Sequence, residues 1–199
     1  MCTFAKMITD YVNIHTHRPT GSGTELLSVG IHPWDAGTAD LAAFSLPDGV
    51  LAIGEIGLDY AKSVDRTRQM EIFRAQLLLA AQRSLPVVIH CVKAFEPLMK
   101  ELAKYPLRAV IFHGFIGSAA QAQRALDSGY YLSFGVRTFA SPKSLEALRL
   151  TPFNRLFVET DDSDVTIEEI YAKIAVEKQI TMCDLKLIIG QNYKQIFHI

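Results

Sequence analysis

The sequence has few cysteines, almost no net charge and no long apolar run, and each of these shortages excludes a class of protein. Three cysteines, Cys2, Cys91 and Cys183, show no paired spacing, so no disulfide framework is predicted and a reducing cytoplasm is the expected location. The formal net charge is −1, so any polyanion must be held by a local cluster or by metal. No apolar run approaches the roughly 18 residues of a membrane span, and no signal-peptide core precedes Lys6. We therefore expect no membrane partner.

The chain is long enough for one sizeable core. Its 199 residues are 49% hydrophobic, and no shift of composition divides them. The prediction is a single domain over residues 1–199.

Short apolar runs that end in histidine or in a carboxylate mark the sequence. They cover residues 12–17, 50–55, 86–90, 109–113 and 156–161. Runs of this length, rich in Val and Ile and separated by amphipathic stretches, are typical of buried parallel strands joined by helices. The C-terminal ends of such strands converge on one face of a closed sheet, so the terminal side chains are expected to share one pocket. Imidazole and carboxylate groups bind metal, and the pocket is therefore predicted to hold metal.

The segments between these runs predict the rest of a β/α fold. Ser63 and Asp65 are expected to cap a helix whose apolar side chains recur near the 3.6-residue period, namely Met70, Phe73, Leu77, Ala80 and Ala81. Further helices are predicted over residues 39–46, 94–104, 118–128 and 141–148, with two more after Asp161, and further strands over 26–31 and 130–134. The predicted fold class is α/β, a distorted TIM-like β/α barrel with seven strands.

Each strand-end residue has an ordinary explanation when it is taken alone. His15 and His17 are two residues apart on a strand and point to the same side, so one ion can bind both imidazoles, but this spacing is a weak signal by itself. A carboxylate such as Glu55 often caps a turn, although Gly54 and Gly57 beside it predict close approach of the backbone to something bound. The repetition of metal-binding residue types at the same place in successive units favours a metal site.

Several longer segments carry a family resemblance. They are Asn13-Ile14-His15-Thr16-His17, Gly30-Ile31-His32-Pro33, residues 52–60 with Gly54-Glu55-Ile56-Gly57-Leu58-Asp59-Tyr60, residues 86–90, His113-Gly114-Phe115-Ile116-Gly117, Glu159-Thr160-Asp161, and Asn192 with Phe197. Taken together they resemble the TatD family of metal-dependent hydrolases, within the amidohydrolase-like barrel enzymes. The segment that begins at Gly54 is the most specific of them.

The resemblance implies a site with two divalent ions, expected to be Zn, Mn or Mg, and hydrolase activity, commonly on DNA. In this family His15, His17 and Asp161 would hold one ion, His90 and His113 would hold the other, and Glu55 would bridge them. Asp161 would also orient or deprotonate the attacking water, so Asp161 and Glu55 are the expected catalytic residues. Residues expected to contact substrate or to support the ligands are His32, Asp59, Lys93, Arg137 and Glu159. Of these, Asp59 and Glu159 are expected to fix imidazole tautomers, with capping of a loop as the alternative.

The chain departs from the family pattern at several positions. Asn13 replaces the usual opening acid, which predicts weaker metal binding. Val92 stands where an arginine is common, with Lys93 next to it, and Ile116 stands where the family favours serine. Only twelve residues separate His17 from Gly30, so we expect a shortened member with an open seam beside its first strand.

The sequence leaves alternatives for substrate and assembly. The expected function is a phosphodiesterase acting on DNA. Another ester, such as a small phosphoester or an aminoacyl ester on transfer RNA, is the nearest alternative, and a binding module without turnover is a further one. Cations expected to grip nucleic acid are Arg18, Lys62, Arg66, Lys93 and Arg137. A monomer or a homodimer is expected.

Overall fold

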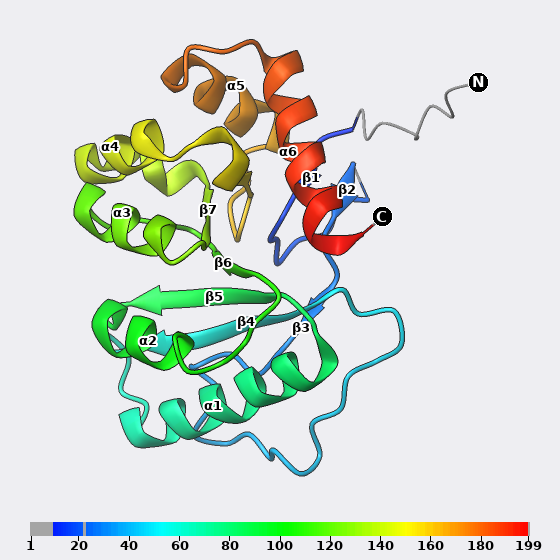
Figure 1. Ribbon diagram of the computed structural model, residues 1–199, viewed down its shortest axis with the longest axis vertical. Coiled ribbons are helices and arrows are strands. Elements are labelled where there is room, and N and C mark those ends of the chain that lie inside the picture. Colours follow the sequence, from blue (N-terminus) through cyan, green and yellow to red (C-terminus); the bar gives the residue numbers. More distant parts are fainter. Residues whose placement is uncertain (1–9, 22, 199) are drawn as a thin grey trace. The chain divides into compact units, whose positions relative to one another are not determined.

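The structure, a computed structural model, describes residues 10–21 and 23–198 and divides into two compact units. The central unit is Leu27–His113, and the terminal unit joins the chain up to Leu26 with the chain from Gly114 onward. Figure 1 lets the reader follow both along the sequence by colour. The single domain expected over residues 1–199 stays a prediction.

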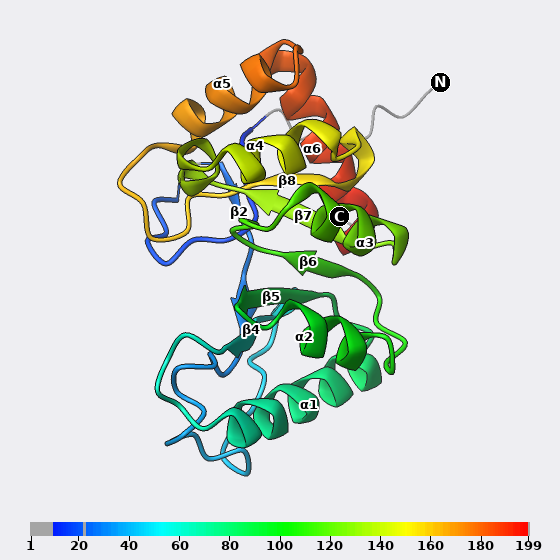
Figure 2. The ribbon, with the colours of Figure 1, turned by 90° about the vertical axis from the view of Figure 1, so that its left-hand side faces the viewer.

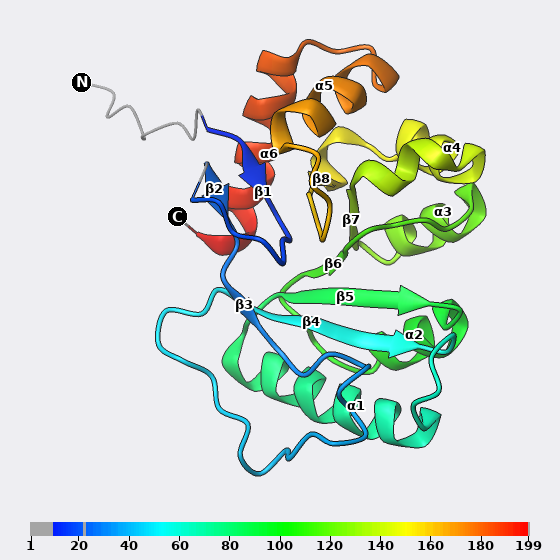
Figure 3. The same cartoon turned by 180° about the vertical axis from the view of Figure 1, so that it is seen from behind.

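The central unit is built on parallel strands in the order β3, β4, β5, β6. Their bounds are Ser28–Val29, Ala52–Asp59, Val87–Val92 and Val110–Phe112. Every residue of β4 is buried, as expected for a strand inside a parallel sheet. Figures 1 and 3, seen from opposite sides, place α1 (Arg66–Arg83) and α2 (Phe95–Leu102) on the same face of β4 and β5.

The terminal unit also contains parallel strands. They are β1 (Val12–Asn13), β2 (Thr24–Glu25), β7 (Tyr131–Phe134) and β8 (Leu156–Val158). Strand β1 is bonded on both edges, because it pairs with β2 and the Ile14 amide donates to the Val158 carbonyl at 3.1 Å. Strand β7 pairs with the other edge of β8. The described part of the chain therefore shows no open seam at β1, which corrects that expectation.

Helices cover the strands of the terminal unit. They are α3 (Ala119–Asp127), α4 (Pro142–Leu150), α5 (Ile167–Glu177) and α6 (Met182–Phe197), with short 3-10 turns η1 (Val136–Ala140) and η2 (Phe153–Arg155). Helix α6 packs on β1 and β8, and α3 packs on α4 and β7. Figure 2 shows α3 and α4 side by side next to β7.

Capping residues set where the helices begin. Asp65 caps α1 by accepting from the Arg68 amide at 2.8 Å, as predicted. Ser118 and Gln121 form a reciprocal capping box at the start of α3. The helices predicted over residues 94–104, 118–128 and 141–148, and the two after Asp161, are all confirmed within two residues of most of their predicted ends.

The expected number of strands is wrong. Residues 10–21 and 23–198 contain eight strands and not seven, because the segment expected as one strand over 26–31 is two short strands. Thr24–Glu25 pairs with β1, whereas Ser28–Val29 pairs with β4. Hydrophobic pattern does not reveal such a change of partner, since both pieces are extended and similarly half-buried.

The helix predicted over residues 39–46 is also wrong. The backbone forms turns there. Asp40 accepts from the Ala42 amide at 2.9 Å, a local bond that competes with helix formation. Pro47 disfavours helical backbone at the residue before it.

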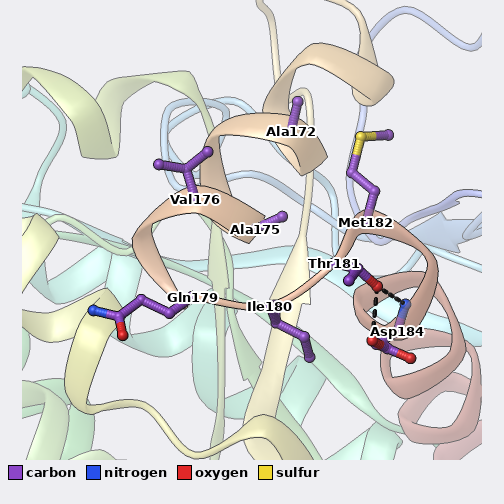
Figure 4. Close-up of a pocket in the computed structure, with 8 residues that line it drawn as sticks. All are labelled: Ala172, Ala175, Val176, Gln179, Ile180, Thr181, Met182 and Asp184. Atoms are coloured by element: carbon purple, nitrogen blue, oxygen red, sulfur yellow. Dashed lines mark hydrogen bonds between the residues drawn. The ribbon is translucent and has the colours of Figure 1, made fainter.

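A surface groove lies where α5 ends and α6 begins (Figure 4). Val176 and Ile180 contribute to its apolar lining, and Asp184 is occupied with Thr181, whose hydroxyl donates to it at 2.7 Å. The groove brings together no set of metal-binding groups. Among the described residues, no helix is both long and apolar enough to cross a membrane.

Candidate metal centre

Three of the predicted ligands gather in the terminal unit. His15 and His17 follow β1, and Asp161 follows β8. Their ligand atoms lie close together: His15 Nε2 is 3.3 Å from His17 Nε2, and Asp161 Oδ1 is 3.8 Å from the first and 3.6 Å from the second. The His15 side chain is 5% exposed and that of His17 53%, so solvent reaches one side of this terminal cluster.

Backbone pairing places the terminal cluster. The Asp161 amide donates to the His15 carbonyl at 3.1 Å, and the His17 amide donates to the Asp161 carbonyl at 3.0 Å. Just before it, the Asn13 amide group donates to the Thr160 hydroxyl at 2.8 Å and accepts from the Thr160 amide at 3.0 Å. Asn13 therefore fastens β1 to the end of β8, a role that the comparison with the family acid did not suggest.

The spacing of the terminal cluster suits a metal ion. Four-coordinate ions with bonds of roughly 2.0–2.1 Å hold neighbouring ligand atoms about 3.3–3.4 Å apart. The three observed separations, 3.3, 3.6 and 3.8 Å, are at or slightly above this range. Two imidazoles with one carboxylate form a donor set typical of Zn and Mn.

The central unit holds a second group, which we call the central cluster: Glu55, His90, His113 and His32. Glu55 Oε1 contacts His90 Nδ1 directly and lies 2.5 Å from His113 Nε2 and 3.3 Å from His32 Nε2. His90 Nδ1 is 3.3 Å from His113 Nε2. The Glu55 and His90 side chains are almost fully buried. A buried carboxylate that faces three imidazoles is a donor set that fits a metal ion.

His32 belongs to this group by position. It forms with Glu55 and His90 a set of ligand atoms close enough to hold one ion. Its expected role toward substrate stays a prediction. Glu55 lies inside β4 and not at its end, because the strand continues to Asp59.

Asp59 supports His90 from the other side. Its Oδ2 lies 3.4 Å from His90 Nε2, while its oxygens accept from the Trp34 indole at 2.7 Å and from the Ala61 amide at 2.9 Å. Burial alone would raise the pKa of Asp59, but these hydrogen bonds and His90 outweigh it and lower the pKa. An ionised Asp59 favours the proton on His90 Nε2, which leaves Nδ1 with its lone pair toward Glu55.

Two buried glutamines of α1 were not anticipated from the sequence. Gln76 accepts from the Ile31 amide at 2.6 Å and donates to the Ile31 carbonyl at 3.1 Å. Gln69 makes the same pair of bonds to Asp59, at 2.8 and 3.0 Å. They hold the backbone at Asp59 and directly before His32. A polar residue within the apolar stripe of the predicted helix was the available signal.

The glycines of β4 serve a different purpose from the one expected. A Cβ on Gly57 would lie 2.0 Å from the His90 carbonyl oxygen, and one on Gly54 would lie 2.5 Å from the Val88 Cβ. Gly57 also has φ of +145°, which side chains rarely adopt. The close approach is therefore between β4 and β5, and the prediction of approach to a bound group is corrected.

The remaining predicted residues are dispersed. Lys93 is exposed after β5, and Glu159 is fully buried in the terminal unit, with its side chain near Gly114 and Gly135. Arg137 pairs with Asp162 at 3.4 Å on the surface. Their expected roles stay predictions.

The cations nominated for nucleic acid have different neighbours. Arg18 is ion-paired with Asp164. Lys62 Nζ instead lies 3.9 Å from the centroid of the Trp34 ring, and the Arg66 guanidinium lies 4.6 Å from that of Tyr60. Trp34, which sequence reasoning overlooked, is half exposed and also contacts His32, with ring centroids 4.8 Å apart.

Known proteins resemble this chain in sequence. Residues 21–198 match the family model described as TatD related DNase. The chain is 33% identical to the uncharacterized metal-dependent hydrolase YabD of Bacillus subtilis, over 86% of this chain and 77% of that protein. It is 35% identical to the protein named 3'-5' ssDNA/RNA exonuclease TatD of Erwinia amylovora, over 67% of this chain and 56% of that one.

Solved structures share the fold. The TatD homologue YjjV of Escherichia coli superimposes with a TM-score of 0.86 at 21% identity, over 97% of this chain and 100% of that one. The phosphotriesterase homology protein of Escherichia coli gives 0.65 at 18% identity, over 89% of this chain and 76% of that one. These likenesses show the predicted fold class, an α/β fold of the TIM-like barrel type.

Proposed function

Because the chain belongs to the TatD-related DNase family, we propose that this metal-dependent hydrolase is a phosphodiesterase that cleaves DNA with two divalent ions. One observation carries the proposal. Each unit gathers imidazole nitrogens and carboxylate oxygens at spacings that fit metal ligands. Relatives named as 3'-5' ssDNA/RNA exonucleases support nucleic acid as the substrate.

We assign one ion to each cluster. His15, His17 and Asp161 would hold the ion of the terminal unit, and Glu55, His90 and His113 that of the central unit. Four histidines favour Zn or Mn over Mg. When bound, two such ions supply an activated water and positive charge for the phosphoryl and leaving oxygens. The bridge assigned to Glu55 and the single pocket for all six ligands stay predictions.

The chain's own residues would guide the reaction. The Asp161 carboxylate, whose side chain is 18% exposed, is open enough for a water molecule to reach it. It would hold that water in line with the phosphodiester and accept its proton. Asp59 would keep the His90 tautomer fixed by its contact at 3.4 Å.

The test combines metal analysis with a substrate panel. The purified protein is analysed for bound metals, stripped with a chelator, and assayed on DNA, RNA, an aryl phosphodiester and an aminoacyl ester of transfer RNA. We expect cleavage of DNA that chelation abolishes and Mn or Zn restores. Hydrolysis of the aminoacyl ester without cleavage of any phosphodiester would contradict the proposed reaction.

Glu55→Gln tests the two-metal mechanism more closely. It keeps the size of the side chain but removes the charge that faces three imidazoles. We expect DNA cleavage to fall by orders of magnitude, with the melting temperature little changed. Glu71→Gln is the matched control, because Glu71 is an exposed glutamate of the same unit paired only on the surface with Arg68. Wild-type rates in Glu55→Gln with metal still bound would overturn the mechanism.

A further inference from the structure

Trp34 is an exposed aromatic ring held in a fixed orientation beside the central cluster. Its indole nitrogen donates to Asp59 at 2.7 Å, and its backbone amide donates to His32 Nδ1 at 3.2 Å. The ring centroid is 4.8 Å from that of His32 and 6.2 Å from that of His90. Yet 50% of the residue remains exposed. We propose that Trp34, with Lys62, forms a stacking subsite for an unpaired nucleobase of single-stranded nucleic acid.

The neighbouring cations fit this ligand. Lys62 Nζ rests 3.9 Å from the Trp34 ring centroid, and Arg66 lies over Tyr60. A cation on an exposed ring is weakly held, so the flexible Lys62 side chain is free to leave the ring face to a base and to contact the phosphate beside it. Aromatic rings with adjoining cations are how proteins bind single strands without sequence preference.

The other nominated cations are less suited to this role. Arg18 is paired with Asp164, and Arg137 with Asp162. A polyanion would have to displace these carboxylates first. Lys62 and Arg66 have no such acid in the contacts described for them, and their aromatic neighbours add a surface for the base.

The geometry selects an unpaired base. Inside a duplex both faces of each base are already stacked, so a protein ring reaches only a base that is unpaired or splayed out. DNA and RNA share this chemistry. The subsite rests on the proposed function, because it would hold a nucleotide next to the ligands proposed to bind metal.

The sequence provides its own probe, since Trp34 is the single tryptophan of the chain. With divalent ions removed by a chelator, we expect a short oligothymidylate or oligouridylate to quench the emission of Trp34. A phosphodiester chain of the same length without bases should not quench it, and a blunt duplex should quench it far less. Equal quenching by the chain without bases, or by the duplex, would overturn the subsite.

Two variants separate stacking from the hydrogen bond to Asp59. Trp34→Leu and Trp34→Phe both lose that bond, but only Phe keeps a ring. Binding of a labelled oligothymidylate, followed by anisotropy, should weaken by about 5- to 150-fold in Trp34→Leu, the range for loss of one stacked base. Trp34→Phe should recover much of this loss. Equal affinities of the two variants would overturn the subsite.

Failure of the proposed function would look different. If the wild-type protein binds oligothymidylate with quenching but does not cleave it after divalent ions are restored, the subsite stands and the nuclease proposal fails. If it cleaves the oligonucleotide without any change in Trp34 emission on binding, the nuclease proposal stands and the subsite fails.

Discussion

Gln76→Leu should loosen the segment that presents His32 and Trp34. Gln76 is 1% exposed, and both ends of its amide bond to the peptide groups of Ile31, at 2.6 and 3.1 Å. Leucine fills a similar volume but offers neither bond. The two bonds contribute about 1 kcal/mol each, and the half-buried Ile31 groups left without partners add about 1 kcal/mol more. Leucine recovers about 1 kcal/mol through its apolar surface.

The expected net loss is therefore about 2 kcal/mol of unfolding free energy. For a chain of this size that corresponds to a fall in Tm of about 4–8 °C. Urea unfolding followed by circular dichroism measures the loss, and the emission of Trp34, three residues beyond Ile31, reports the local change. Gln82→Leu is the control, because Gln82 is exposed on the same helix. If both variants have the stability and the Trp34 emission of the wild type, the anchoring role of Gln76 is wrong.

Two more predictions concern charge. Arg74, with a pair of hydrogen bonds at 2.9 and 3.0 Å, and Lys104 lower the pKa of the buried Glu101 below its ordinary value of 4.5. Its contribution to stability is thus present above pH 4.5 and lost as the pH falls through the lower folded value. Glu101→Gln should cost about 1 kcal/mol at pH 7, since Arg74 and Lys104 are half exposed, and the difference from wild type should vanish in acid-unfolding curves. A difference that persists at low pH would contradict this. Neutralising Lys62 and Arg66 together should reduce the salt dependence of single-strand binding by roughly 0.7 in the log–log slope per lost contact, whereas neutralising Arg18 and Arg137 should change it less. Equal effects of the two pairs would show that the aromatic neighbours do not matter.

Much of the fold was predictable because its signals are local. Apolar runs became β4, β5, β6 and β8, and Asp65 and Ser118 began helices as capping residues do. The switch of pairing between residues 24–25 and 28–29 was not predictable, because it depends on which strands lie on either side. The turns over residues 39–46 were missed because a short apolar segment does not distinguish helix from turn.

The candidate site shows the same division. The strand-end pattern identified the histidines and carboxylates that gather within each unit. The supporting residues did not follow from it. Gln69 and Gln76 act through side-chain bonds to backbone far away in sequence, and the ring of Trp34 is fixed by Asp59, 25 residues later. Such contacts depend on tertiary packing, which no period or spacing encodes.

The central claim, that each cluster binds its own divalent ion, is tested most directly by anomalous diffraction from crystals of the protein grown with Mn or Zn. The account predicts one anomalous peak among His15, His17 and Asp161 and another among Glu55, His90 and His113. Crystals with full metal content by elemental analysis but with no peak at either set of side chains would contradict it.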